Sequence, residues 1–232
     1  MIAERPRPWL GAGVRWLLQR RLRGGLAAVR VIGLERLQAL AAQRPLLICG
    51  NHVCFWDGLV ISQITTLTRL DTRVLMRAEP LRQAPLLRWA GCFGLEAGDP
   101  RDGARVVRHA AALLDRPGRA VWVFPQGAQR PQWERPLGFS RGFELIARRA
   151  PRALLVPLSL HYELCEREQP EAWVHFGPPV SDPSKLEAAV TSGLDALMAR
   201  VRAGPPVPSL WPEPRRLGEG PASRLLARVL GR

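Results

Sequence analysis

The feature that most constrains the fold of this chain is the alternation of short, continuous apolar runs with segments of helical periodicity. Such short runs are typical of strands that are buried on both faces of a sheet. They predict strands at 27–32, 46–49, 73–76, 120–124, 154–161 and 173–176, and a weaker one at 93–95. The helical pattern predicts helices at 34–42, 58–67, 85–90, 102–114, 142–149 and 186–202. We therefore expect an α/β fold, with one domain built on a mixed, mostly buried sheet of about six or seven strands flanked by helices.

Positive charge is concentrated at the two ends of the 232-residue chain. The net charge is +14, and nearly all of it comes from arginine, because Lys185 is the only lysine. Residues 1–30 hold seven arginines and one glutamate, and residues 201–232 hold six arginines and two glutamates. We divide the chain into a basic amphipathic helix at 1–26, a central domain at 27–203, and a Pro-rich linker with a basic amphipathic tail at 204–232.

Both ends show the periodicity of an amphipathic helix. At the N-terminal end the apolar face holds Leu10, Val14, Leu17 and Leu18, with Trp9 and Trp16 near its boundary. At the C-terminal end it holds Leu225, Leu226, Val229 and Leu230. Basic amphipathic helices with interfacial tryptophans suit an anionic membrane surface, where each arginine contributes roughly 1 kcal/mol. The alternative is that both helices pack on the body of the protein and leave their arginines in solvent.

The composition excludes several other classes of protein. No apolar run is long enough to span a bilayer, and the N-terminus lacks the pattern of a secretory signal. Four scattered cysteines indicate a reducing compartment rather than a disulfide scaffold. A pI near 11.4 would suit nucleic acid, but no nucleic-acid-binding motif or aromatic-rich strand is present. We expect a peripheral protein on the cytoplasmic face of the cell membrane, with no nucleic-acid partner.

A histidine and an aspartate follow the apolar run at 46–49. His52 and Asp57 would lie about 140° apart on a regular helix, but in a turn that enters a helix they can face each other. Asp57 could then accept a hydrogen bond from Nδ1 of His52 and leave Nε2 free to take a proton. This is the arrangement of a general base with its orienting carboxylate. The alternative is that Asp57 caps the helix and His52 is an ordinary loop residue.

Two further interpretations of this turn involve its cysteines. Cys54 could be a nucleophile activated by His52, but cysteine–histidine pairs rarely come from neighbouring positions. Cys49, His52 and Cys54 could bind a metal, but Cys49 ends a buried strand and no second cluster of ligands follows. We therefore expect neither a metal nor another cofactor.

Five short blocks follow one another between residues 30 and 180. They are Asn51–Asp57, Gly91–Glu96, Phe124–Gln129, Phe139–Gly142 and Val156–Leu158. In this order and spacing they resemble the glycerolipid acyltransferase superfamily, typified by 1-acylglycerol-3-phosphate acyltransferases. The resemblance implies that His52 deprotonates a hydroxyl group of a lipid acceptor, which attacks the thioester of acyl-CoA or acyl carrier protein, without a metal or an acyl-enzyme. It also implies substrate-binding positions at Asn51, Cys54, Phe124, Pro125, Gln126, Gly127, Arg130 and Pro157.

At several positions where the family usually has a charged residue, this chain has an uncharged one. Ala97 and Gln129 stand where the family usually has arginines that hold the acceptor's phosphate, and Gln126 and Ala128 replace glutamate and threonine. Losing two charged hydrogen bonds would weaken phosphate binding by about 3–6 kcal/mol unless other arginines substitute, for which Arg101, Arg105 and Arg130 are the candidates. We therefore favour a neutral acceptor, a glycolipid or glycosylated isoprenoid, over a lysophospholipid. The alternatives are a catalytically idle homologue that binds lipid or acyl carriers and, less favoured, a basic nucleic-acid-binding protein.

Overall fold

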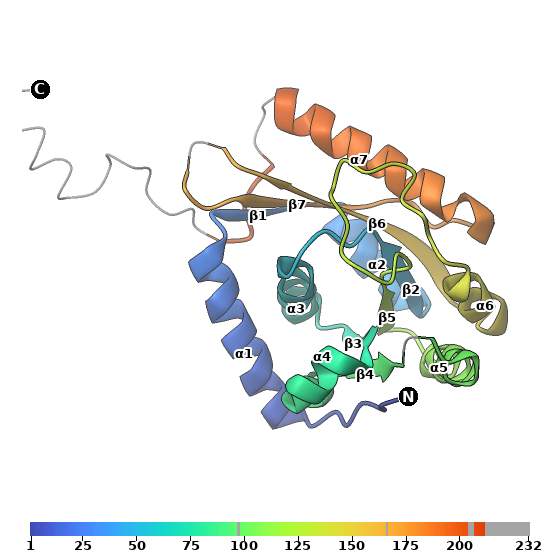
Figure 1. Cartoon of the computed structure of the whole chain (residues 1–232). Coiled ribbons are helices and arrows are strands. Elements are labelled where there is room, and N and C mark those ends of the chain that lie inside the picture. Colours follow the sequence, from blue (N-terminus) through green and yellow to red (C-terminus); the bar gives the residue numbers. More distant parts are fainter. Residues whose placement is uncertain (97, 166, 204–206, 212–232) are drawn as a thin grey trace, which may run out of the picture.

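A mixed seven-stranded sheet forms the centre of the computed structural model, which describes residues 1–96, 98–165, 167–203 and 207–211 (Figure 1). Within these residues the strand order is β1-β7-β6-β2-β5-β3-β4. Strands β6, β2, β5, β3 and β4 run parallel, whereas β7 is antiparallel to β6 and β1 is parallel to β7. The strands are β1 (Ala28–Ile32), β2 (Leu46–Gly50), β3 (Asp71–Arg77), β4 (Cys92–Leu95), β5 (Arg119–Val123), β6 (Leu154–Glu163) and β7 (Glu171–Phe176).

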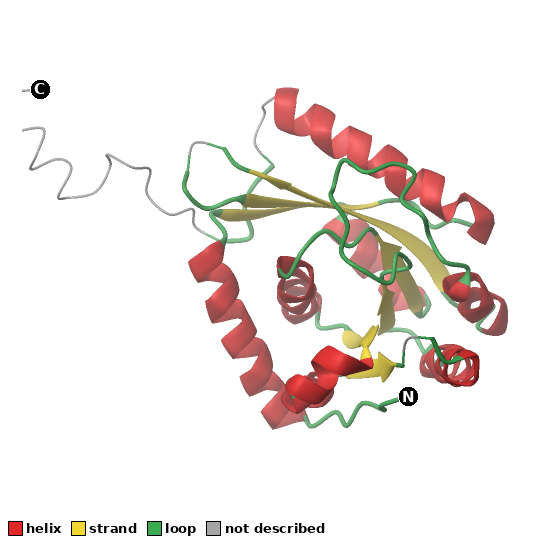
Figure 2. Ribbon diagram, viewed as in Figure 1, coloured by secondary structure: helices red, strands yellow, loops and turns green. Residues whose placement is uncertain are grey.

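Helices cover both faces of this sheet, as the layered view in Figure 2 shows. They are α1 (Pro8–Gly25), α2 (Leu34–Gln43), α3 (Trp56–Thr68), α4 (Ala78–Gln83), α5 (Pro100–Leu113), α6 (Gly142–Arg149) and α7 (Leu186–Ala203), with short 3₁₀ turns η1 (Pro85–Ala90) and η2 (Pro183–Lys185). Alternate residues of the central strands enter two separate cores. Leu46 and Ile48 of β2 pack with α1, α2 and α3, whereas Leu47 and Cys49 pack with α5, α6 and α7. The central strands are therefore apolar on both faces, which explains the continuous apolar runs in the sequence.

The α/β class and the mixed, buried sheet predicted from the sequence are confirmed. Two elements differ from the prediction. The segment Ala78–Gln83 forms a short helix that no periodic pattern indicates, because six residues are too few to show one. The predicted helix at 85–90 is a 3₁₀ turn, η1.

Helix α1 packs along the body of the protein, but its apolar residues do not all face the same way. Val14 and Leu22 are buried and Leu18 packs against the core, whereas Leu10 and Leu17 are 43% and 56% exposed. The predicted single apolar face is therefore divided into a buried stripe and an exposed one. None of the described helices is long and apolar enough to cross a membrane. The predicted tail helix at 225–230 lies outside the described residues.

Candidate active site

The five parallel strands end at one edge of the sheet, where the chain leaves β2 and turns into α3. His52 lies in this turn and Asp57 in the first turn of α3. The Nδ1 atom of His52 lies 2.6 Å from Oδ2 of Asp57, so the turn brings the two side chains together as the sequence predicts. The Asp57 side chain is fully buried and that of His52 is 24% exposed. The pair therefore has a buried carboxylate behind an imidazole ring that reaches the surface.

The carboxylate of Asp57 also holds the turn itself. Its Oδ2 accepts hydrogen bonds from the backbone N–H groups of Val53 and Cys54, at 2.7 and 3.2 Å. The helix cap is Phe55, not Asp57 as in the alternative interpretation, and Phe55 makes no side-chain capping bond. Asp57 thus links the backbone before the helix to the imidazole ring.

Two residues of the third sequence block, Phe124 and Gln126, and Arg130, which follows the block, fix the position of His52. The ring of Phe124 stacks on the imidazole, with ring centroids 4.4 Å apart and planes 14° apart. The backbone N–H of His52 donates to Oε1 of Gln126 at 2.6 Å, and its carbonyl oxygen accepts from the backbone N–H of Arg130 at 2.9 Å. His52 is therefore held at its ring and at both backbone polar groups.

Side-chain amides continue the backbone pairing where the strands separate at this edge. Asn51 donates to the carbonyl oxygen of Leu160 and accepts from its N–H, both at 2.8 Å. Gln126 accepts from His52 and donates to the carbonyl oxygen of Leu137 at 3.1 Å. Both polar atoms of each of these predicted substrate-binding residues thus have partners inside the protein.

Two further residues belong to this network, Gln132 and Tyr162, and the sequence motifs predict neither of them. The amide of Gln132 accepts from the N–H of Tyr162 and donates to its carbonyl oxygen, both at 2.9 Å. The hydroxyl group of Tyr162 donates to Oδ1 of Asp57 at 2.6 Å. A sequence signal existed, because Tyr162 is the only tyrosine of the chain and follows the predicted strand at 154–161.

The other predicted substrate-binding residues differ in their burial and in their contacts, and Cys54 is the one that lies beside the histidine–aspartate pair. Cys54 lies beside Asp57, with its Sγ 3.9 Å from Oδ1. Pro125 is buried at the end of β5, and Gly127 is exposed in the turn that follows. Arg130 is half-buried and its Nη1 donates to Glu134 at 2.6 Å. Pro157 is buried within β6, where it pairs with Cys49 and not with the turn.

The structure disfavours the two alternatives that involve cysteines. Burial, followed by the negative charge of Asp57, raises the pKa of the Cys54 thiol to about 11, so the thiolate needed for nucleophilic attack is scarce near neutral pH. Cys49 is fully buried, and this burial raises its pKa far above the usual range. Among the described residues no group of three or more His, Cys, Asp and Glu side chains could hold a metal ion.

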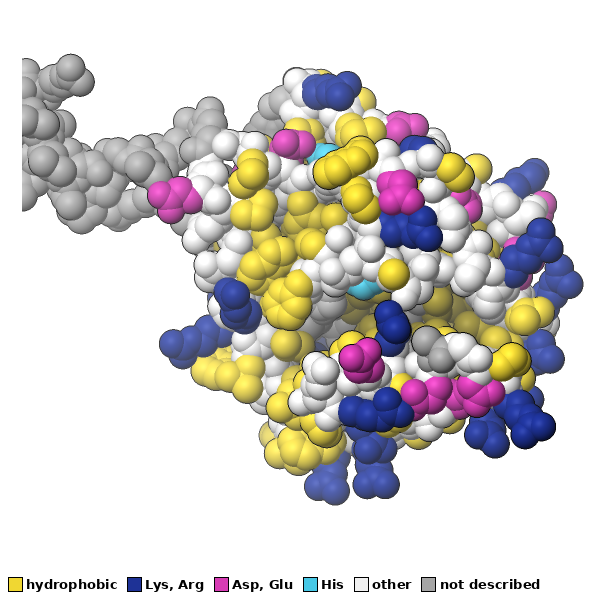
Figure 3. Space-filling view, in the orientation of Figure 1, with side chains coloured by type: hydrophobic (Ala, Val, Ile, Leu, Met, Phe, Trp, Pro, Cys, Tyr) yellow, Lys and Arg dark blue, Asp and Glu magenta, His cyan; other side chains and the backbone are white. Residues whose placement is uncertain are grey.

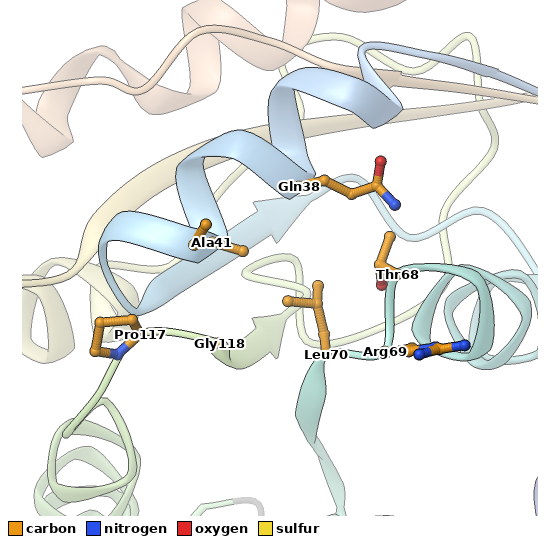
Figure 4. A pocket seen from close by; sticks show the side chains of 8 residues that line it. Gln38, Ala41, Thr68, Arg69, Leu70, Pro117 and Gly118 are labelled. Carbon is orange, nitrogen blue, oxygen red and sulfur yellow. The ribbon is translucent and has the colours of Figure 1, made fainter.

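A cavity of about 420 Å³ lies at the opposite edge of the sheet (Figure 4). Leu70 and Gly118, which line it, come just before β3 and β5. Arg69 also lines it, in a left-handed backbone conformation with φ of 56°. Because His52 follows the carboxyl end of β2, this cavity at the amino ends is remote from the pair and is not part of the candidate active site.

Gly127 allows the turn that carries Gln126, because its φ of 68° is left-handed. An added Cβ meets no atom within 4 Å, so only backbone strain opposes a side chain there. We expect Gly127→Ala to lower the free energy of unfolding by about 1–2 kcal/mol and to lower activity through Gln126. Denaturant unfolding measures the first effect, with Gly103→Ala in helix α5 as the control, since it should be stabilising by about 0.5–1 kcal/mol. A Gly127→Ala protein as stable as the wild type would contradict this.

The fold and the site define an α/β protein with a histidine–aspartate pair at the carboxyl edge of its sheet. A family model described as Acyltransferase matches residues 28–161, more than half of the chain. The chain therefore belongs to this family, the glycerolipid acyltransferases that it resembles in sequence, and it is an enzyme that transfers acyl groups from a donor to a lipid acceptor. No curated protein matches the chain.

Proposed function

We propose that this acyltransferase uses His52 as a general base to esterify a neutral hydroxyl group of a lipid. The observation that carries the proposal is the contact of 2.6 Å between His52 Nδ1 and the buried carboxylate of Asp57. This contact directs the ring so that Nε2 faces away from the carboxylate and is available to a substrate. Near neutral pH a histidine is the side chain best suited to take and return a proton.

The proposed reaction is a direct transfer. Nε2 of His52 takes the proton of the acceptor hydroxyl while its oxygen attacks the thioester carbonyl carbon and forms the new C–O bond. The negative charge of Asp57 stabilises the imidazolium that results. The tetrahedral intermediate then loses the thiolate as the C–S bond breaks. The imidazolium returns its proton to the sulfur, which leaves an ester and the free thiol of coenzyme A or of the acyl carrier protein.

The oxyanion of the intermediate needs hydrogen-bond donors near the histidine. The N–H of Gly127 already donates to the carbonyl oxygen of Phe124 at 3.0 Å. The next two residues, Ala128 and Gln129, are exposed, and their N–H groups donate to no described residue. The residue that follows them, Arg130, donates its N–H to the backbone carbonyl oxygen of His52, so Ala128 and Gln129 directly precede a residue that contacts the histidine. We therefore assign the oxyanion donors to Ala128 and Gln129.

The charges near the site favour an acceptor without a phosphate. The guanidinium of Arg130, the candidate to replace the family's phosphate-binding arginine, is paired with Glu134. Arg101 and Arg105 are exposed on α5, and Ala97 lies outside the described residues. Arg77 is exposed at the carboxyl end of β3, and its side chain has no ion pair or hydrogen bond to a described residue. We assign this cation to the donor, since coenzyme A and acyl carrier proteins both carry phosphate.

A comparison of two acceptors tests the proposal. We expect the purified protein, given palmitoyl-CoA in mixed vesicles, to acylate octyl glucoside at least about tenfold faster than lysophosphatidic acid, because Ala97 and Gln129 replace the arginines that would hold the phosphate of the latter. Mass spectrometry of the two esters measures the ratio. Faster turnover of lysophosphatidic acid would contradict the neutral acceptor, and acylation of neither compound with either palmitoyl-CoA or palmitoyl acyl carrier protein would contradict the esterification itself.

We also propose that α1 docks the enzyme on the cytoplasmic face of an anionic membrane. Trp9, Trp16 and Leu17 are 90%, 57% and 56% exposed and lie on one side of the helix. Figure 3 shows hydrophobic side chains gathered along α1, with arginine side chains beside them. Phe55, in the turn that holds the histidine, is 61% exposed. Since α1 passes close to Trp56, docking through α1 would bring the catalytic turn near the lipid surface.

A further inference from the structure

Strand β6 continues beyond the end of its neighbour β2. The two strands pair as far as Gly50 and Leu158, and the amide of Asn51 carries the contact on to Leu160. Two residues later, Tyr162 lies beside the turn that holds the histidine–aspartate pair. The family match ends at residue 161, so the assignment to the family says nothing about Tyr162.

The hydroxyl group of Tyr162 occupies the side of Asp57 that the histidine does not use. Oδ2 of Asp57 receives His52 and two backbone N–H groups, whereas Oδ1 receives the phenol at 2.6 Å and, more distantly, the thiol of Cys54 at 3.9 Å. The phenol is thus the one strong donor to Oδ1 among the described residues. Without it, the buried carboxylate could satisfy Oδ1 only by rotating away from its present partners.

The phenol is itself fixed as a donor. Its burial, and then the negative charge of Asp57, raise the pKa of Tyr162 well above its usual value near 10, so it keeps its proton. Its backbone is clamped on both sides by the amide of Gln132, which belongs to the loop that also contributes Gln126 and Arg130 to the support of His52. Tyr162 therefore joins this loop to Asp57.

We propose that Tyr162 is a positioning residue for acyl transfer, whose hydroxyl group keeps the Asp57 carboxylate turned toward His52. This inference rests on the proposed function, since it concerns the same proton transfer. Three side chains would then act together, with Tyr162 bonded to Asp57 and Asp57 bonded to His52. Of these three, only His52 touches substrate.

The variant Tyr162→Phe removes the hydroxyl group and keeps the ring. We expect kcat to fall about tenfold, as when a supporting hydrogen bond to a reactive group is removed, with KM for the acyl donor unchanged. The control is Ser159→Ala, which removes another buried hydroxyl from the same strand, one that bonds only to the carbonyl oxygen of Val190. That variant should keep wild-type kcat. Equal kcat losses in the two variants would mean a merely structural role for Tyr162.

A double variant separates positioning from direct contact with substrate. If Tyr162 acts through Asp57, adding Tyr162→Phe to Asp57→Asn should lower kcat by less than twofold, because the carboxylate it serves is already gone. A further tenfold loss in the double variant would show that Tyr162 acts independently of Asp57 and would overturn the proposal.

A spectroscopic measurement on the free protein makes the test independent of any acceptor. The imidazole proton of His52 that bonds to Asp57 should give a downfield NMR signal that is absent from His52→Ala. We expect this signal to move upfield or disappear in Tyr162→Phe and to stay in place in Ser159→Ala. An unchanged signal in Tyr162→Phe would overturn the positioning role. A shifted signal in a protein that acylates neither test acceptor would support positioning and contradict only the proposed function.

Discussion

We expect His52→Ala to lower kcat for acyl transfer by about 10³-fold, the contribution typical of a positioned general base, while the protein stays folded. The imidazole ring is partly exposed, and the buried Asp57 carboxylate that loses it keeps its hydrogen bonds from the backbone of Val53 and Cys54 and from Tyr162. The backbone groups of His52 that bond to Gln126 and Arg130 are kept. Initial rates with palmitoyl-CoA, measured beside circular dichroism and the denaturation midpoint, separate the loss of chemistry from the loss of structure.

The chain offers a matched control in a second histidine–carboxylate pair. Nε2 of His109 lies 2.7 Å from Glu4, away from the carboxyl edge, and the ring contacts Phe93 edge to face. We expect His109→Ala to keep kcat within about twofold, although it also breaks a pair of this kind. A His52→Ala enzyme with wild-type kcat, or a His109→Ala enzyme as slow as His52→Ala, would show that the base lies elsewhere.

Local pattern predicts the sheet and the histidine–aspartate pair because both depend on residues close in sequence. The central strands are apolar along most of their length, and such runs are visible without any knowledge of the neighbouring strand. His52 and Asp57 are only five residues apart in the sequence. Their contact therefore needs only that the chain turn from β2 into α3.

The rest of the site depends on how far one strand extends beyond another, which sequence spacing does not reveal. Tyr162 reaches Asp57 only because β6 continues past the last pair that it makes with β2. Gln132 reaches Tyr162 from a loop 30 residues earlier. The amides of Asn51 and Gln126, for which substrate contact stays a prediction, also bond to the backbone of Leu160 and Leu137, partners that their positions in the sequence do not indicate.

For helix α1, too, the sequence predicts the element but not which of its apolar side chains stay exposed on the surface of the protein. Helical periodicity identifies its apolar residues, but not which of them the body covers. Packing buries Val14 and Leu22, and Gly25 lets the helix end approach Trp56, whose ring lies 2.0 Å from where a Cβ would be. The remaining apolar residues, Trp9, Leu10, Trp16 and Leu17, are left exposed as a stripe. Because exposed tryptophans on a basic helix suit a lipid interface, this stripe rather than the whole apolar face is the candidate membrane contact.

The triple variant Trp9→Ser, Trp16→Ser, Leu17→Ser tests this contact. These side chains are exposed, so their replacement should leave stability unchanged, while each loses about 1 kcal/mol or more of apolar burial in the lipid interface. We expect partition to vesicles of phosphatidylglycerol and phosphatidylcholine, measured by sedimentation, to fall at least about 10²-fold. Leu145→Ser, an exposed leucine on α6, is the control and should partition like the wild type.

The arginines of α1 should contribute in a different way, which salt can distinguish. The guanidinium of Arg20 lies 5.8 Å from the ring of Trp16, beside the exposed stripe. Its attraction to anionic lipid is screened beyond about 10 Å in 0.1 M salt, whereas the apolar contribution is not. The wild type should therefore lose part of its vesicle binding as salt rises and keep the part that the tryptophans supply. Triple-variant binding equal to that of the wild type at high salt would mean that the apolar stripe does not enter the membrane.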